Sequence, residues 1–169
     1  MPLPLIASLT KTVVALLAQS EAVLLFAGDA MQHKAQLDAA SCGDGTYSFT
    51  ECFEQVKDIV GSADYAIVNL ETPLGGRPYR GYPCFSAPDS YAEALAGSGF
   101  DLLLTANNHT LDARDRGLKR TVATLDSMAI SHIGTYENAD SRAKEIPFVV
   151  NIKGFKVGFL NYTYGTNGI

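Results

Sequence analysis

The sequence predicts an α/β fold with a mainly parallel sheet and flanking helices. Short apolar runs of strand length alternate with segments of helical period along most of the chain. This alternation is typical of βαβ units, in which each helix returns the chain to a parallel strand. The chain has 169 residues, 47% of them hydrophobic, which is enough for one domain with a sizeable core. We therefore expect a single α/β domain whose strands all end at the same edge.

The first half of the chain predicts two strands and a helix between them. Val23–Ala27 is an apolar run of strand length, and a second such run is Tyr65–Leu70. Between them, Ser48–Glu51 has the pattern of a capping box, which stabilises the first turn of a helix. Apolar residues then recur at helical spacing, at Phe49, Phe53, Val56 and Val60. We expect this helix to end near Gly61.

The second half continues the alternation after a long loop. Thr72–Pro88 is rich in proline, glycine and aromatic residues and is expected to be an ordered loop. A helix is expected at Asp89–Ala96, a third strand at Phe100–Thr105, an amphipathic helix at Arg116–Met128 and a fourth strand at Ile130–Ile133. The last predicted elements form a hairpin of two runs that alternate around a Lys-Gly turn, Phe148–Ile152 and Phe155–Asn161.

Two interpretations of the N-terminus stay open. Leu3–Leu17 is largely apolar, and Ser20-Glu21-Ala22 resembles the cleavage site of a signal peptide. The alternative is an amphipathic helix packed on the domain, because Lys11 interrupts the apolar run. We divide the chain into an apolar segment, 1–21, and a domain, 22–169. The first interpretation predicts a cell-envelope or exported location, and the second allows a cytoplasmic one.

Charge and cysteine content exclude two classes of function. The net charge is -5 and the pI is near 5.1, which argues against nucleic acid as a partner. No C-x-x-C pair occurs, so a zinc site built from thiolates is not expected. A single disulfide and unpaired small residues of the core are the two interpretations of the three cysteines, Cys42, Cys52 and Cys84.

Polar side chains follow the first three predicted strands. Asp29 follows the first, Asn69 and Glu71 end the second, and Asn108 and His109 follow the third. Each residue alone is more often a turn or capping residue. Together they are expected to converge at one edge, where ligands of open α/β sheets bind. Carboxylate, amide and imidazole groups suit Mn, Fe, Mg or Zn, and a shared carboxylate allows two cations about 3.5–4 Å apart.

Other polar residues have weaker expectations. His33 lies four residues after Asp29 and either faces the same cleft or, as we rather expect, takes an exposed position. His132 is expected as a hydrogen-bonded histidine of the fourth strand. A group of cationic and aromatic residues on the long loop either lines a substrate groove or merely packs the loop, namely Arg77, Tyr79, Arg80 and Tyr82.

Three segments carry a resemblance to a known family. Gly28–Met31, Val68–Leu74 and Ala106–Asp112 resemble the capsule-synthesis CapA family, the poly-γ-glutamate synthesis group of the calcineurin-like metallophosphoesterase superfamily. The resemblance implies an α/β sandwich with two divalent metal ions at the strand ends. It also implies a metal-dependent hydrolase or transferase that acts on γ-glutamyl amide or phosphoester bonds.

Residue by residue, the resemblance assigns roles within these segments. Asp29, Glu71 and Asn108 match metal ligands, and His109 matches the histidine that assists the leaving group. The chain departs from the wider superfamily at Met31, where a histidine would be expected, and in its N-L-E segment, where that superfamily has G-D-x-x-D. Residues expected to support the site or contact substrate are Asn69, Asn107 and Asp112.

The superfamily also supplies histidine ligands from segments beyond those seen here. Because this chain ends at Ile169, we expect it to be the N-terminal portion of a longer protein and the fold to be incomplete at its C-terminal side. The expected partners are an anionic polymer or small-molecule substrate and envelope assembly proteins. Two alternatives to an enzyme stay open: a non-catalytic polymer-binding component of a capsule assembly or export machine, and an inactive truncated product.

Overall fold

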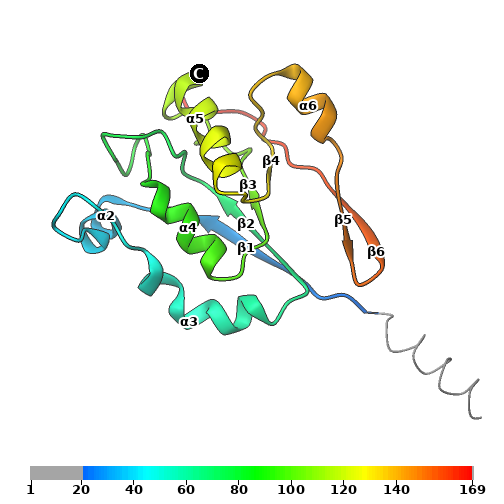
Figure 1. Ribbon diagram of the computed structural model, residues 1–169. Helices are drawn as coiled ribbons and strands as arrows, with labels where there is room; N and C mark the ends of the chain where they lie inside the picture. The colour runs from blue at the N-terminus through cyan, green and yellow to red at the C-terminus, as the bar shows by residue number, and fades with distance from the viewer. Residues whose placement is uncertain (1–20, 169) are drawn as a thin grey trace, which may run out of the picture.

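A computed structural model describes residues 21–168, so both interpretations of the N-terminal segment concern residues that lie almost wholly outside it. Its centre is a parallel sheet in the order β1-β2-β3-β4 (Figure 1). The strands are β1 (Leu24–Ala30), β2 (Tyr65–Leu70), β3 (Leu102–Leu104) and β4 (His132–Ile133). The predicted mainly parallel α/β fold is therefore confirmed.

Helices connect successive strands, and a hairpin follows them. The helices are α2 (Lys34–Ala40), α3 (Thr50–Gly61), α4 (Asp89–Gly97), α5 (Arg114–Ser127) and α6 (Ala139–Glu145). The predicted hairpin is confirmed as an antiparallel pair, β5 (Phe148–Ile152) and β6 (Phe155–Phe159). Within residues 21–168, no helix is both long and apolar enough to cross a bilayer.

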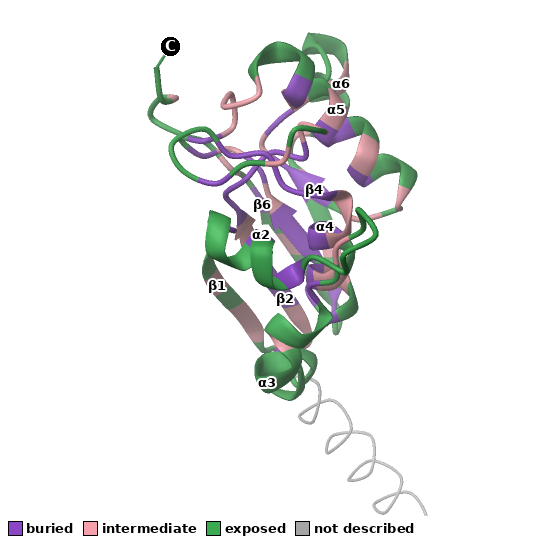
Figure 2. Cartoon of the chain, turned by 90° about the vertical axis from the view of Figure 1, so that its left-hand side faces the viewer, coloured by how far each residue is buried: buried purple, intermediate pink, exposed green. Residues whose placement is uncertain are grey.

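The sheet has a hydrophobic cluster on each face. On one face, Val68 of β2 and Leu103 of β3 pack with residues of the helices, such as Leu95 and Leu125. On the other face, β-strand side chains pack with the hairpin, in a cluster of Ile67, Leu102, Ile133, Ile152 and Phe159. Successive strand residues point to opposite faces, so continuous apolar runs such as that of β2 belong to a sheet covered on both sides. Figure 2 shows the buried residues gathered at this centre.

The expected capping box at Ser48–Glu51 is wrong. The N-cap of α3 is Phe49, and no side chain caps the helix. Phe49 is 1% exposed, and its ring lies edge-on to that of Tyr91, 4.9 Å away. Burial of a large aromatic side chain outweighs a cap of about 1 kcal/mol, which explains why packing decides this helix start.

The sequence did not predict α2 or α6. Only Leu37 and Ala40 of α2 are buried, so this helix has no extended apolar period. No residue of α6 is buried. Its signal is the cap instead, because the Asn138 side chain accepts hydrogen bonds from the N–H groups of Asp140 and Ser141.

The three cysteines and two of the histidines differ in their exposure and contacts. All three cysteines are unpaired and exposed, which excludes the core interpretation and, in this structure, a disulfide. His33 is exposed, as expected. His132 lies buried in β4 with its Nε2 3.1 Å from Asp126 Oδ1, which confirms the hydrogen-bonded interpretation.

Gly134, directly after β4, packs closely against Ala106 in the loop that follows β3. Its φ is +114°, a backbone conformation that favours glycine, and a Cβ there would collide with Asn161 Oδ1 and the backbone of Ala106. Asn161 Oδ1 accepts a hydrogen bond of 2.7 Å from the Ala106 N–H. The segment after β6 thereby holds the start of the Asn-Asn-His segment.

We expect Gly134→Ala to lower the free energy of unfolding by about 3 kcal/mol or more, because backbone strain and a steric collision add. Urea denaturation measures it. Gly154→Ala is the matched control, since Gly154 has a φ of +91° but no atom lies within 4 Å of the place that its methyl group would take. The control is expected to lose only about 1 kcal/mol from strain. Equal losses in the two variants would exclude the collision as the cause.

Candidate functional site

Asp29 lies inside β1 rather than after it. The register between β1 and β2 shifts between Ala27 and Asp29, and this irregularity places Asp29 beside Asn69. Asn69 Nδ2 donates to Asp29 Oδ1 at 2.8 Å and to Glu71 Oε2 at 3.0 Å. One amide group therefore joins two carboxyl groups at the carboxyl ends of neighbouring strands.

The two carboxyl groups influence each other's ionisation. Burial, followed by the hydrogen bond and the negative charge of Asp29, raises the pKa of Glu71 to about 7. The hydrogen bond from Asn69 and a second one with Glu71 lower the pKa of Asp29. Near neutral pH the pair therefore holds a proton readily, and a cation would meet the same electrostatic need.

Asn107 connects this pair to the segment after β3. Its Nδ2 donates to Asn69 Oδ1 at 3.1 Å and to the Leu70 carbonyl at 2.9 Å. Its Oδ1 accepts from the His109 N–H at 3.1 Å. Because both ends of this buried amide are occupied by protein groups, Asn107 positions its neighbours and is not itself available as a ligand.

The imidazole of His109 is held by a carboxylate. Its Nδ1 lies 2.8 Å from Asp112 Oδ2, and that oxygen also accepts from the Phe85 N–H at 2.7 Å. The Phe85 ring packs edge-on against the imidazole with centroids 4.8 Å apart. A carboxylate at Nδ1 favours a proton on that nitrogen, so Nε2 is the ring nitrogen without a carboxylate partner.

Asn108 stands apart from this network. It is exposed, and its backbone carbonyl accepts from the Asn167 N–H at 2.8 Å. Among residues 21–168, its side chain makes no hydrogen bond to Asp29 or Glu71. The structure thus joins six of the seven predicted site residues through hydrogen bonds, in the groups Asp29–Asn69–Glu71, Asn69–Asn107 and Asn107–His109–Asp112.

Two contacts of His109 were not predicted from the sequence. One is Phe85, which lies in the long loop and has no polar side chain to mark it. The other is Asn167, whose Nδ2 lies 3.4 Å from both imidazole nitrogens. Asn167 belongs to no recognisable pattern, so only the path of the chain after β6 brings it to the site.

The donor atoms fit part of a site for a hard divalent cation. Asp29 and Glu71 offer carboxylate oxygens in close contact, and carboxylates are preferred by Mg and Mn. The part of the chain that the structure describes contains no group of three or more His, Cys, Asp and Glu residues arranged around one metal position. These residues therefore fit an incomplete ligand set.

The four-stranded parallel sheet with its flanking helices is consistent with a metallophosphoesterase-like α/β fold. More narrowly, the chain belongs to the family described as bacterial capsule synthesis protein PGA_cap, which matches residues 23–169. It is also similar to the capsule biosynthesis protein CapA of Bacillus anthracis, with 26% identity over 125 residues. That match covers 69% of this chain and 29% of the relative, so the chain spans less than a third of that protein.

Proposed function

We propose that this chain carries part of the catalytic centre of a metal-dependent hydrolase or transferase that functions in capsule biosynthesis. The observation that carries the proposal is the carboxyl pair of Asp29 and Glu71, joined through Asn69 and Asn107 to His109. The proposed enzyme would act on a γ-glutamyl amide bond or on a phosphoester bond. Family membership supports a role in capsule synthesis and, with it, a cell-envelope location.

The proposed roles follow from the positions of the side chains and, for Asn108, from the family resemblance alone. Asp29 and Glu71, with the amide oxygen of Asn108, would hold one or two divalent cations, drawn from Mn, Fe, Zn and Mg. When bound, such a cation polarises the scissile group and stabilises developing negative charge. His109, with its Nδ1 held by Asp112 at 2.8 Å, would act in its doubly protonated form, giving the Nε2 proton to the leaving group and keeping the Nδ1 proton on the hydrogen bond to Asp112.

Metal content tests the proposal. In the natural protein that carries this sequence, we expect stoichiometric Mn, Fe or Zn by mass spectrometry, or saturable Mg binding by calorimetry. Asp29→Asn is expected to weaken metal binding at least about tenfold, because a neutral amide replaces a charged donor. Asp58→Asn on the exposed face of α3 is the matched control. A wild-type protein that binds no metal, and whose activity Asp29→Asn leaves unchanged, would contradict the proposal.

A second candidate function is non-catalytic binding of an anionic polymer within a capsule assembly or export machine. Met31 favours it, because a superfamily ligand would be a histidine at that position. The incomplete ligand set among residues 21–168 also favours it. Polymer binding by metal-free protein, together with no turnover at any metal concentration, would select this function over the enzyme.

A further inference from the structure

Arginines gather around one cavity. The chain has six arginines, and five of them line a cavity of about 610 Å³ between the long loop and the start of α5. Arg77 and Arg80 come from the loop, while Arg114, Arg116 and Arg120 come from α5. Since the whole chain has a net charge of -5, this is a local reversal of its overall charge.

Glycines bring the two segments into contact. A Cβ at Gly75 of the loop would collide with the methyl group of Ala113, the N-cap of α5, and a Cβ at Gly117 of α5 would lie 3.6 Å from the Gly75 Cα. Gly76 has a φ of +81° and lies against the Arg120 side chain. Residues without a side chain therefore permit the close approach that places arginines of the loop opposite those of the helix.

One arginine is neutralised and forms a fixed wall. Arg120 donates to both Asp89 oxygens, at 2.7 and 2.8 Å, and to the Leu74 carbonyl. This pairing holds its guanidinium in place, and the hydrogen bonds with Asp89 raise its pKa further. Arg120 therefore shapes the cavity more than it contributes free positive charge.

The other four guanidinium groups lack an acidic partner. Within residues 21–168, no Asp or Glu oxygen lies within 4.0 Å of Arg77, Arg80, Arg114 or Arg116. Arg77 packs 4.9 Å over the Tyr79 ring and donates to the Gly45 carbonyl, so its side chain is already oriented. Asp112, the one acidic residue lining the cavity, is engaged with His109. Four unpaired cations around one hollow repel each other and attract an anion.

We propose that this cavity binds an oligoanion, a ligand with several carboxylate or phosphate groups, and holds it next to His109. Guanidinium forks bind both kinds of oxyanion in pairs of hydrogen bonds. Asp112 links the cavity to the site, because it lines the cavity and its Oδ2 is 2.8 Å from His109 Nδ1. The inference deepens the proposed function by naming the charge class of the ligand, and it rests on that function only for the role of His109.

Measurements of oligoanion binding in the absence of metal test this proposal. A fluorescent oligoglutamate and a fluorescent oligophosphate are titrated separately, by anisotropy, into the protein in EDTA at low salt. At least one is expected to bind, and binding is expected to weaken as salt rises. The double variant Arg80→Gln/Arg116→Gln is expected to weaken it about thirtyfold or more, since two charge-assisted contacts are lost. Which probe binds better distinguishes a carboxylate ligand from a phosphate ligand.

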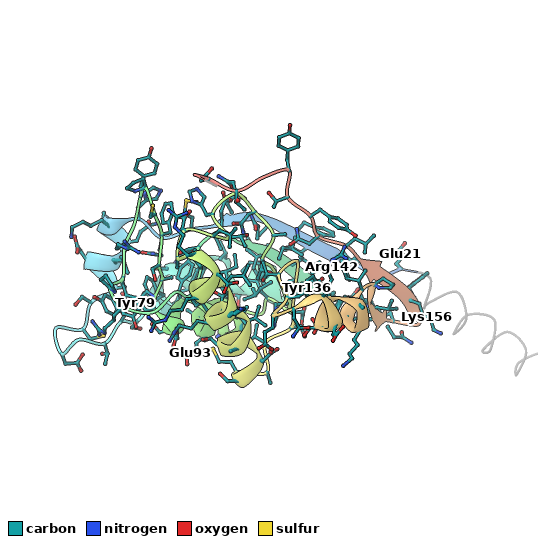
Figure 3. All side chains as sticks on the ribbon, turned by 90° about the horizontal axis from the view of Figure 1, so that it is seen from above. Glu21, Tyr79, Glu93, Tyr136, Arg142 and Lys156 are labelled. Carbon is teal, nitrogen blue, oxygen red and sulfur yellow. The ribbon has the colours of Figure 1, made fainter. Side chains whose placement is uncertain are left out.

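Two further variants serve as controls. Arg142→Gln removes the sixth arginine, which lies on α6 away from Tyr79 of the cavity wall (Figure 3), and is expected to leave binding unchanged. Arg80→Lys/Arg116→Lys keeps the charge but not the fork, and is expected to lose only part of the affinity. All variants are compared by thermal unfolding, because the substituted side chains are exposed and should not alter folding.

No binding of either probe, or equal weakening by Arg142→Gln, would overturn the inference. Because the titration excludes metal, its result is independent of the metal measurement. Arginine-dependent binding in a protein that never binds metal would overturn the catalytic proposal and leave this cavity assignment standing.

Discussion

Replacing His109 with glutamine is expected to slow the hydrolysis of a substrate with a poor leaving group by about 10²–10⁴-fold, the usual contribution of a general acid. The reason lies in the geometry around the imidazole. Asp112 holds Nδ1, Phe85 holds the ring edge-on, and Nε2 is left for the proton that a departing oxygen or nitrogen needs. Glutamine retains a polar side chain but cannot deliver a proton.

Two phosphodiester probes separate proton donation from a structural role. Phenyl esters release a phenol with a pKa of about 10, which needs a proton, whereas nitrophenyl esters release a stable anion that needs none. His109→Gln is therefore expected to slow the phenyl ester far more than the nitrophenyl ester. A γ-glutamyl anilide, assayed in parallel, reports on the amide alternative.

His132→Gln is the matched control for this experiment. His132 is also a buried histidine bonded to an aspartate, but it lies in β4 and takes no part in the network of Asp29 and Glu71. Its replacement should leave the ratio of the two ester rates unchanged. Equal slowing of both esters by His109→Gln would contradict proton donation and indicate that His109 only positions its neighbours.

Replacing Glu71 with glutamine is expected to stabilise the metal-free protein and to weaken the stabilisation that added metal provides. In metal-free protein at pH 8, Glu71→Gln should raise the free energy of unfolding by about 2 kcal/mol, because the native state no longer holds a buried carboxylate against Asp29. Glutamine can still accept from Asn69 and donate to Asp29, as a protonated Glu71 does. For a domain of this size, the melting temperature should rise by about 5 °C.

The sign of the pH dependence follows from the direction of the shift. The pKa of Glu71 rises from 4.5 to about 7 on folding, so the folded protein binds this proton more tightly than the unfolded chain. The stability associated with it is complete below about pH 4.5 and is lost as pH rises through 7. Wild type and Glu71→Gln should therefore have similar stability near pH 4.5 and differ most at pH 8.

Added metal should remove much of the difference in stability between the two proteins. At a hundredfold excess over its dissociation constant, a bound cation stabilises wild type by about 2.7 kcal/mol, while Glu71→Gln lacks a charged donor and gains less. Glu54→Gln, the same change at an exposed position of α3, is the matched control and should alter stability by less than about 0.5 kcal/mol. A loss of stability in metal-free Glu71→Gln at pH 8 would show that the buried carboxylate of Glu71 beside Asp29 does not destabilise the folded protein, which contradicts this prediction.

Different parts of the fold could be predicted from the sequence to different extents. The central strands and α5 could be predicted from their apolar patterns, because those side chains pack in the core. The apolar period of α3 also predicted a helix, although Val60 is its one buried residue and Val56 is 41% exposed. The helix α6 has no such period, since none of its residues is buried, and the start of α3 depends on Phe49 packing against Tyr91. Local apolar patterns therefore do not predict α6 or the first residue of α3.

The candidate site divides in the same way. The order of elements alone predicts that Asp29, Asn69, Glu71 and His109 lie at one edge, because parallel strands joined by helices all end on the same side. The sequence does not contain the bulge that sets Asp29 beside Asn69, nor the 2.8 Å contact of His109 with Asp112 in a ring packed on Phe85. It also contains no sign that Asn108 is left outside the hydrogen-bonded network.

By itself, the sequence determined the fold class, the strands that carry the site and the family resemblance, because periodicity and short motifs are local properties of the chain. Only the tertiary structure decided which side chains touch, how Glu71 is shifted in pKa, and that five arginines share one cavity. Those properties depend on distances between residues far apart in the sequence, such as Arg80 and Arg116. Such distances are fixed by packing of the whole domain, not by any segment of it.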